Sequence, residues 1–367
     1  MKTLTSLTFA VFYFLILGCS SNDDAPSGSD DVDPNIPLGS YFPPLNSDEW
    51  ETISLESLDW NEAATQPLLD FLEEKNTNAF IILKDGRIAM EVYFNSSSAS
   101  SNAPWYSAGK TLSAFTLGIA QEEGFLSLEN TSNDYLGSGW SSLDAAEESS
   151  IKVIHHLSMT TGLDYTVSNT NCTTPDCLTA LNTPGNFWYY HNATYTLSQS
   201  IISGAVGQDF NTYFTTKLKN PIGMDGNWLQ LGFSNVYYST ARSMARFGLL
   251  NLNEGSWDGN PILGNSAYFS AMTNTSQDLN KAYGYLWWLN GKESFRVPAS
   301  EVQFPGKLIP NAPDDLIAGL GKDDQKLYVI PSKGLVIVRM GDDAGETLLG
   351  PSSFDNELWE KINAVIN

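Results

Sequence analysis

Strand-forming segments lie near both ends of this chain, and a long helical region separates them. Residues 79–94 contain two apolar runs joined by Asp85-Gly86, a dipeptide typical of a tight hairpin turn. Residues 326–340 show a second hairpin pattern, and residues 356–366 have the spacing of an amphipathic helix. Residues from about 107 to 250 are mainly helical in pattern. We therefore expect an α+β fold in which both ends build one antiparallel sheet, flanked by helices, with the helical region inserted between its strands.

The start of the helical region carries the most distinctive chemistry. Ser107-Ala108-Gly109-Lys110 precedes an apolar run that reads as a buried helix, and side chains three residues apart share one helix face. Burial lowers the pKa of a lysine because it disfavours the charged form. Lys110 could therefore accept the hydroxyl proton of Ser107, or its positive charge could tune that hydroxyl, while Ser107 attacks a carbonyl carbon. The serine-x-x-lysine spacing also occurs by chance, so it needs partners elsewhere in the chain.

Two later segments supply candidate partners. The first is Tyr190-His191-Asn192, which ends an aromatic run, and the second is Lys322-Asp323-Asp324, which precedes a clear strand. Each segment also has a simpler interpretation. Tyr190 could belong to the core, Asn192 could be a turn or cap residue, and Lys322 could be an exposed lysine with no specific role.

In this order, the three segments resemble the three motifs of the serine β-lactamase and penicillin-binding protein superfamily. The likeness is closer to its class C branch, which includes related esterases, D-amino-acid peptidases and 6-aminohexanoate-dimer hydrolases. Four further segments resemble family elements and follow the family's order: 156–163, 238–250, 257–259 and 283–288. The likeness as a whole covers roughly residues 50–365. The resemblance implies a β-lactamase/transpeptidase-like fold with its active site between the sheet and the helical region.

The resemblance also implies roles for individual residues. Ser107 would be the nucleophile that forms an acyl-enzyme with an ester or amide, and Lys110 would assist it. Tyr190 would be the general base, as a phenolate stabilised by nearby lysines. Asn192 would hydrogen-bond Lys110 and the amide of the substrate.

The third motif differs from the family pattern. Lys322 matches the lysine of the usual Lys-Thr-Gly, and the backbone N–H of Gln325 would form the oxyanion hole with that of Ser107. Asp323 and Asp324 replace the usual threonine and glycine, and would place negative charge where the carboxylate of a β-lactam binds. We therefore expect poor β-lactam hydrolysis, and a neutral or cationic amide or ester as the small-molecule substrate.

Other mechanisms fit the sequence less well. A Ser-His-Asp hydrolase of the α/β type needs a G-x-S-x-G elbow, which the chain lacks, and a metal hydrolase needs clustered ligands. The chain has three histidines, two of them adjacent (His155 and His156), so we expect no metal and no cofactor. Two alternatives stay open. One is a penicillin-recognising or peptidoglycan-sensing protein with little turnover, and the other is a true β-lactamase or DD-peptidase.

The N-terminus has the pattern of an export signal. Residues 7–17 form an apolar run that ends in Gly18-Cys19, which predicts a signal peptide over residues 1–18 and lipidation of Cys19. The alternative is an ordinary signal peptide with an incidental cysteine. Residues 19–45 would be a flexible acidic tether, and residues 46–367 the hydrolase domain. The acidic residues after Cys19 resemble surface-export signals of Bacteroidetes lipoproteins. We therefore expect an exported lipoprotein, periplasm-facing or surface-exposed at the bacterial outer membrane.

Charge and cysteine content limit the partners. The formal net charge of −23 argues against nucleic acid and against an electrostatic grip on anionic lipid, so membrane contact would come only through the lipid anchor. Cys172 and Cys177 lie in a polar loop, which in an exported protein predicts a local disulfide. A metal site is the competing interpretation, but no histidine cluster accompanies them. Nothing in the sequence indicates the oligomeric state.

Overall fold

The computed structural model describes residues 39–345 and 353–367. The predicted signal peptide, Cys19 and most of the predicted tether lie outside the described residues. One folded unit spans Leu38–Asn367, so the predicted domain boundary at residue 46 falls inside it. The ring of Phe42 packs against Trp257 at 5.1 Å, and the carbonyl oxygens of Pro43 and Pro44 accept hydrogen bonds from the buried Arg246. Residues 39–45 are therefore part of the folded domain.

The described residues form both α-helices and β-strands. The α-helices are α1 (Thr65–Glu74), α2 (Lys110–Glu122), α3 (Asn133–Leu136), α4 (Ala145–Ser150), α5 (Val153–Leu157), α6 (Asn192–Val206), α7 (Phe210–Phe214), α8 (Ala241–Leu252), α9 (Ser266–Met272) and α10 (Ser353–Ile366). The strands are β1 (Thr77–Lys84), β2 (Arg87–Tyr93), β3 (Ala103–Pro104), β4 (Asn227–Leu231), β5 (Ser234–Ser239), β6 (Ser256–Trp257), β7 (Asn260–Pro261), β8 (Trp288–Leu289), β9 (Ser294–Phe295), β10 (Phe304–Pro305), β11 (Ile317–Leu320), β12 (Lys326–Ile330) and β13 (Leu335–Gly341).

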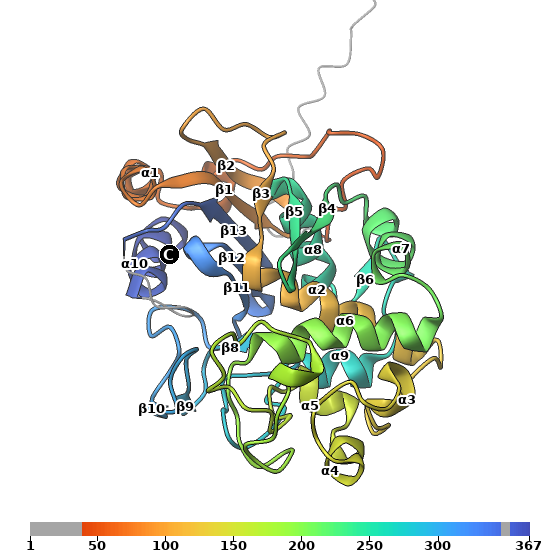
Figure 1. Cartoon of the computed structure of the whole chain (residues 1–367). Coiled ribbons are helices and arrows are strands. Elements are labelled where there is room, and N and C mark those ends of the chain that lie inside the picture. The colour runs from red at the N-terminus through yellow and green to blue at the C-terminus, as the bar shows by residue number, and fades with distance from the viewer. Residues whose placement is uncertain (1–38, 346–352) are drawn as a thin grey trace, which may run out of the picture. The chain divides into compact units, whose positions relative to one another are not determined.

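The main sheet combines strands from both ends of the chain. Its order is β2-β1-β13-β12-β11-β8, and every neighbouring pair is antiparallel. Both predicted hairpins are present, with the Asp85-Gly86 turn between β1 and β2. In Figure 1, the orange pair β1 and β2 lies directly beside the blue strands of the C-terminal part. The predicted α+β architecture is therefore confirmed.

Helices cover both faces of this sheet. Alternate residues of a strand point to opposite faces. Lys326 and Tyr328 of β12 face α10, where Tyr328 packs against Trp359 at 5.7 Å. Leu327, between them, faces α8. At Gly248, an added Cβ would lie 2.9 Å from Leu327, so the glycine lets α8 approach the sheet closely. Because both faces are covered, β12 and β13 are buried along their whole length.

The inserted region is mainly helical, as predicted, and it also contains the small sheet β3-β5-β4. Helix α2 lies at its centre, and every residue from Lys110 to Ala120 is buried. Within residues 39–345 and 353–367, no helix has the length and apolar character needed to cross a membrane.

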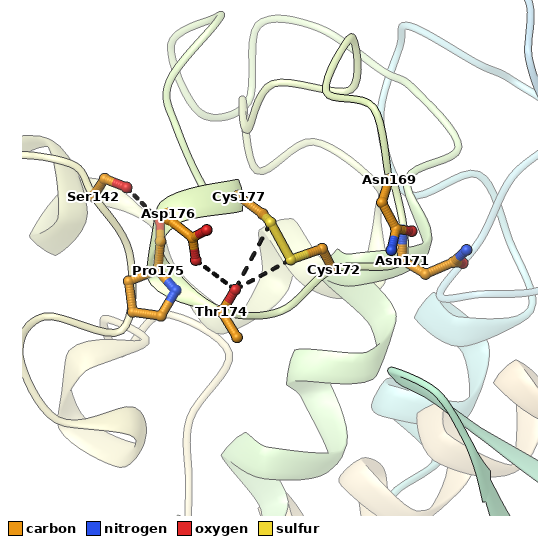
Figure 2. The surroundings of a disulfide bond; sticks show 8 residues. All are labelled: Ser142, Asn169, Asn171, Cys172, Thr174, Pro175, Asp176 and Cys177. Carbon is orange, nitrogen blue, oxygen red and sulfur yellow. Dashed lines mark hydrogen bonds between the residues drawn. A yellow bond between two sulfur atoms is a disulfide. The ribbon is translucent and has the colours of Figure 1, made fainter.

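A disulfide closes part of the long loop before α6. Cys172 and Cys177 are joined as predicted. Figure 2 shows Thr174 beside the bond, with its hydroxyl 3.2 Å from the Cys172 sulfur. The carbonyl oxygen of Thr170 accepts a hydrogen bond of 3.0 Å from the Ala193 N–H. The loop is therefore tied to the first turn of α6.

Candidate active site

Ser107 and Lys110 meet as the sequence predicted. Ser107 lies in a short 3₁₀ turn, Tyr106–Gly109, and Lys110 is the first residue of α2. The Lys110 Nζ donates a hydrogen bond of 2.8 Å to the Ser107 Oγ. Lys110 is only 2% exposed, and burial lowers its pKa to about 7. A substantial fraction of neutral amine is therefore available near neutral pH to accept the serine proton.

Two tyrosine rings enclose the lysine. The Lys110 Nζ lies 4.8 Å from the ring centre of Tyr190 and 4.1 Å from that of Tyr195. Tyr195 was not among the predicted site residues. Its signal was its position on α6, three residues after Asn192, which places the two residues on one helix face.

Tyr190 contacts the nucleophile, but its protonation differs from the expectation. Its ring stacks on Trp288 at 5.8 Å and meets the edge of Tyr283 at 6.3 Å. Burial in these surroundings raises the pKa of Tyr190, and a hydrogen bond with Ser107 offsets only part of that rise. Tyr190 is therefore a neutral phenol at neutral pH, and not the phenolate expected from the resemblance. The physical reason is burial, which disfavours the charged phenolate.

Asn192 lies at the cavity but does not make the expected bond. It begins α6, and no hydrogen bond joins it to Lys110 among the described residues. Its Oδ1 is buried and has no partner in residues 39–345 and 353–367. This oxygen is therefore an unused acceptor at the wall of the cavity.

The strand that leads to Ser107 is β11, which comes before Lys322. The sequence had associated the third motif with the strand after Lys322, which is β12. At Gly321, which follows β11, an added Cβ would lie 2.3 Å from the Trp105 carbonyl oxygen and 3.3 Å from the Ala108 nitrogen. The chain at Leu320-Gly321 therefore lies directly against the Ser107 turn, and only glycine fits there. Lys322-Asp323-Asp324 forms the following turn. The sequence did contain a sign of this close packing, because Gly319-Leu320-Gly321 stands immediately before the lysine.

Gln325 is not brought to the cavity. Its buried side chain donates hydrogen bonds to the carbonyl oxygens of Asp323 (2.9 Å) and Gly341 (2.6 Å). Its backbone N–H points to the Lys322 carbonyl oxygen at 3.5 Å. The structure thus gives Gln325 a role in holding the turn, and it corrects the expected role in an oxyanion hole.

The charged turn lies differently from the expectation as well. Lys322 is at the cavity, with a side chain that is 59% exposed and an Nζ 3.8 Å from the Asp323 carboxylate. Asp324 points away from the cavity and forms a buried ion pair of 3.0 Å with Lys326. Neither aspartate is among the residues that line the cavity: Asp323 lies beside Lys322, and Asp324 is paired inside the fold.

The cavity over Ser107 is small and mostly uncharged. Its volume is about 170 Å³, and Lys322 supplies the only charged side chain of its lining: Ser107, Thr170, Tyr189, Tyr190, Asn192, Trp288, Pro298, Ala299, Leu320, Gly321 and Lys322. A larger cavity of about 610 Å³ lies apart from it, beside residues 45–50 and the start of α8. Among the described residues, no group of His, Cys, Asp or Glu side chains could hold a metal ion.

Comparison with known proteins gives a family match over most of the chain. The family model described as Beta-lactamase matches residues 72–347, a span that contains the whole cavity lining. The chain belongs to the beta-lactamase family. This confirms the predicted superfamily, whose members are serine hydrolases, and the β-lactamase/transpeptidase-like fold. No curated protein matches the chain.

Solved structures of similar proteins share the fold at low sequence identity. A protein named as a 6-aminohexanoate-dimer hydrolase from Bacillus anthracis is 20% identical, with a TM-score of 0.65 and 86% of each chain covered. A protein named as a beta-lactamase from Bacteroides dorei is 15% identical, with a TM-score of 0.67, and 84% of this chain and 99% of that chain are covered. A beta-lactamase from Mycobacterium bovis is 16% identical, with a TM-score of 0.57 and coverages of 81% and 97%.

Proposed function

We propose that this protein hydrolyses an amide or ester bond of a small molecule through an acyl-enzyme on Ser107. The observation that carries the proposal is the 2.8 Å hydrogen bond from a fully buried Lys110 to the Ser107 Oγ. A lysine with a pKa of about 7 can take the proton that the serine must lose to attack a carbonyl carbon. The solved relatives named as hydrolases and beta-lactamases support the same reaction class.

The proton path follows the three contacting side chains. Ser107 Oγ attacks the carbonyl carbon while its proton passes to Lys110. The neutral phenol of Tyr190, hydrogen-bonded to Ser107, then protonates the leaving nitrogen or oxygen as its bond to carbon breaks. Lys110, which holds the proton taken from Ser107, then returns it to the Tyr190 phenolate. Its Nζ lies 4.8 Å from the Tyr190 ring centre, and the acylated Ser107 oxygen takes no part in this transfer. In deacylation, water gives up a proton along this path and the serine hydroxyl is restored.

Two backbone N–H groups would stabilise the oxyanion. They belong to Ser107, in the 3₁₀ turn, and to Lys322, directly after the closely packed Gly321. Neither N–H has a hydrogen-bond acceptor among the described residues. Donors aimed at the developing negative charge act mainly in the transition state.

The cavity favours a compact, uncharged acyl group. Three aromatic side chains line it (Tyr189, Tyr190 and Trp288), and its one charged side chain, Lys322, lies 3.8 Å from the Asp323 carboxylate. The unpaired Oδ1 of Asn192 would accept a hydrogen bond from an N–H of the substrate, because a buried acceptor without a partner is costly. We therefore propose neutral amides first and simple esters second.

The replacement Ser107→Ala tests the nucleophile. Hydrolysis of a p-nitrophenyl ester should fall by about 10³-fold or more, and labelling by a fluorophosphonate probe should disappear. Ser149→Ala, on the exposed face of α4, is the matched control and should leave both unchanged. Turnover above roughly a hundredth of the wild-type rate would refute the assignment. Labelling of the wild type without turnover would instead support a penicillin-recognising protein.

We also propose that the protein is exported as a lipoprotein anchored through Cys19. The disulfide between Cys172 and Cys177 supports export, because such bonds persist in oxidising compartments.

A further inference from the structure

Three residues around the proposed oxyanion hole have unusual backbone conformations. Tyr106 has a φ of 46°, Asp323 of 55° and Asp324 of 56°. Residues other than glycine rarely adopt this left-handed region, and they keep it only where the surrounding structure holds them there. Tyr106 directly precedes Ser107, and Asp323 directly follows Lys322. The strained residues therefore adjoin both proposed N–H donors.

The turn that contains Asp323 is held firmly from the side of the sheet. The buried guanidinium of Arg339 donates hydrogen bonds to the carbonyl oxygens of Asp323 (2.9 Å) and Asp324 (3.1 Å). The Gln325 amide donates a further bond to the Asp323 carbonyl oxygen, and Asp324 is paired with Lys326. These contacts fix the backbone of the turn and leave the Asp323 side chain facing the Ser107 segment.

The two donor segments are joined across the hole by side chains. The Tyr106 hydroxyl interacts with the Asp323 carboxylate, and burial, with this carboxylate as a second cause, raises the pKa of Tyr106. The Lys322 Nζ lies 5.6 Å from the Tyr106 ring centre and 3.8 Å from the Asp323 carboxylate. The backbones are in close contact as well, because Gly321 lies against Trp105 and Ala108. Tyr106 and Asp323 thus form a bridge one residue away from each donor.

We propose that Tyr106 and Asp323 are a positioning pair that sets the spacing of the Ser107 and Lys322 N–H groups for the oxyanion. This inference rests on the proposed function. It also gives a reason for the aspartate in this chain's Lys-Asp-Asp turn: the carboxylate holds the turn against the nucleophile segment. Because the donors act on charge that develops in the transition state, a displaced donor lowers kcat and leaves KM almost unchanged.

The test compares Tyr106→Phe, Asp323→Ala and the double variant in hydrolysis of a p-nitrophenyl ester. Each single variant should lower kcat about 10- to 100-fold, within the range expected for a misplaced group, with KM changed less than about threefold. The double variant should lose no more than the single variants, since the two residues act as one unit. Asp323→Asn keeps an acceptor oxygen and should recover much of the rate.

Tyr213→Phe is the matched control, because Tyr213 donates a 2.8 Å hydrogen bond to Glu123 far from the cavity. Affinity for an alkylboronate, which forms a tetrahedral adduct on the serine, should fall in parallel with kcat, while melting temperatures stay close to that of the wild type. A KM effect alone, additive losses in the double variant, or rates equal to that of Tyr213→Phe would overturn the proposal. These outcomes would overturn only the positioning pair. The proposed function would be overturned by a different result, retained activity in Ser107→Ala.

Discussion

At the scale of single residues, the protonation of Lys110 decides what the site can do. No described carboxylate forms an ion pair with it, and its neighbours are the rings of Tyr190 and Tyr195. Burial is the cause of its lowered pKa. Of the two roles considered for this lysine, the structure favours that of proton acceptor, because a permanently charged lysine would need a compensating partner.

This protonation predicts the pH dependence. Below pH 7 the Lys110 amine is protonated and cannot accept the serine proton, so kcat/KM should rise through an inflection near 7 and level off above it. The measurement is a pH–rate profile on a neutral ester. Tyr190→Phe should be about 10²-fold slower or more and keep the inflection. Lys110→Arg should be nearly inactive, because arginine stays charged. A flat profile between pH 5 and 9 in the wild type would contradict the role of Lys110.

Asp324 gives a second prediction at this scale. Replacement by glycine removes the ion pair with Lys326, which keeps Asp355 as a partner at 2.7 Å. Unfolding free energy should fall by about 1–3 kcal/mol, less than for a fully unpaired buried charge. Nitrocefin hydrolysis should show no specific gain. Asp258→Gly, at an exposed aspartate with a similar φ of 48°, should be neutral or slightly stabilising. A nitrocefin-specific gain in Asp324→Gly would restore the idea that this carboxylate repels β-lactams.

At the scale of elements, the long loop before α6, which contains the disulfide, forms one wall of the cavity. Its Thr170 lines the cavity and is bonded to the start of α6. The stacking of Tyr165 on Tyr189, at 3.7 Å between ring centres, holds a second part of the same loop. The loop therefore links the conformation around the disulfide to the position of Asn192.

Removal of the disulfide tests this link. The Cys172→Ser/Cys177→Ser variant should lose about 2 kcal/mol of stability or less, because the closed loop is short. Its KM should rise several-fold with a smaller change in kcat, since the wall moves and the Ser107–Lys110 pair does not. Intact mass after alkylation, with and without reduction, checks the bond itself. Two free thiols in unreduced protein, or an unchanged KM in the variant, would count against the interpretation.

At the scale of the whole molecule, the proposed site is assembled from distant parts of the chain. Ser107 precedes α2, Tyr190 precedes α6 and Gly321 follows β11. The main sheet cannot form from either end alone, because β13 pairs with β1 on one side and β12 on the other. The N-terminal arm at 39–45 packs on the same unit.

The export proposal belongs to this scale. Cys19→Ala should move the expressed protein from the membrane fraction to the soluble exported fraction and leave esterase activity unchanged. Metabolic labelling with a fatty-acid probe should mark the wild type only. Labelling of the Cys19→Ala variant, or its unchanged membrane association, would exclude lipidation at this cysteine.

The sequence by itself determined the features that depend on neighbouring residues. The Ser107–Lys110 contact follows from helical spacing, the Asp85-Gly86 hairpin from turn chemistry, and the Cys172–Cys177 bond from proximity in the chain. The apolar run around Lys110 also predicted its burial and hence its lowered pKa.

The tertiary structure decided what depends on segments far apart in sequence. The end of β11 lies beside Ser107 because Gly321 packs closely against Trp105. A motif match in the sequence does not reveal this contact. The neutral state of Tyr190 depends on Trp288 and Tyr283, about a hundred residues away. Because Asp324 follows Lys322 and Asp323 in the sequence, it was predicted to lie where a β-lactam carboxylate binds. In the fold it is paired with Lys326 inside the protein. In each case the arrangement is stabilised by burial and by contacts between distant segments, which exist only once the chain has folded.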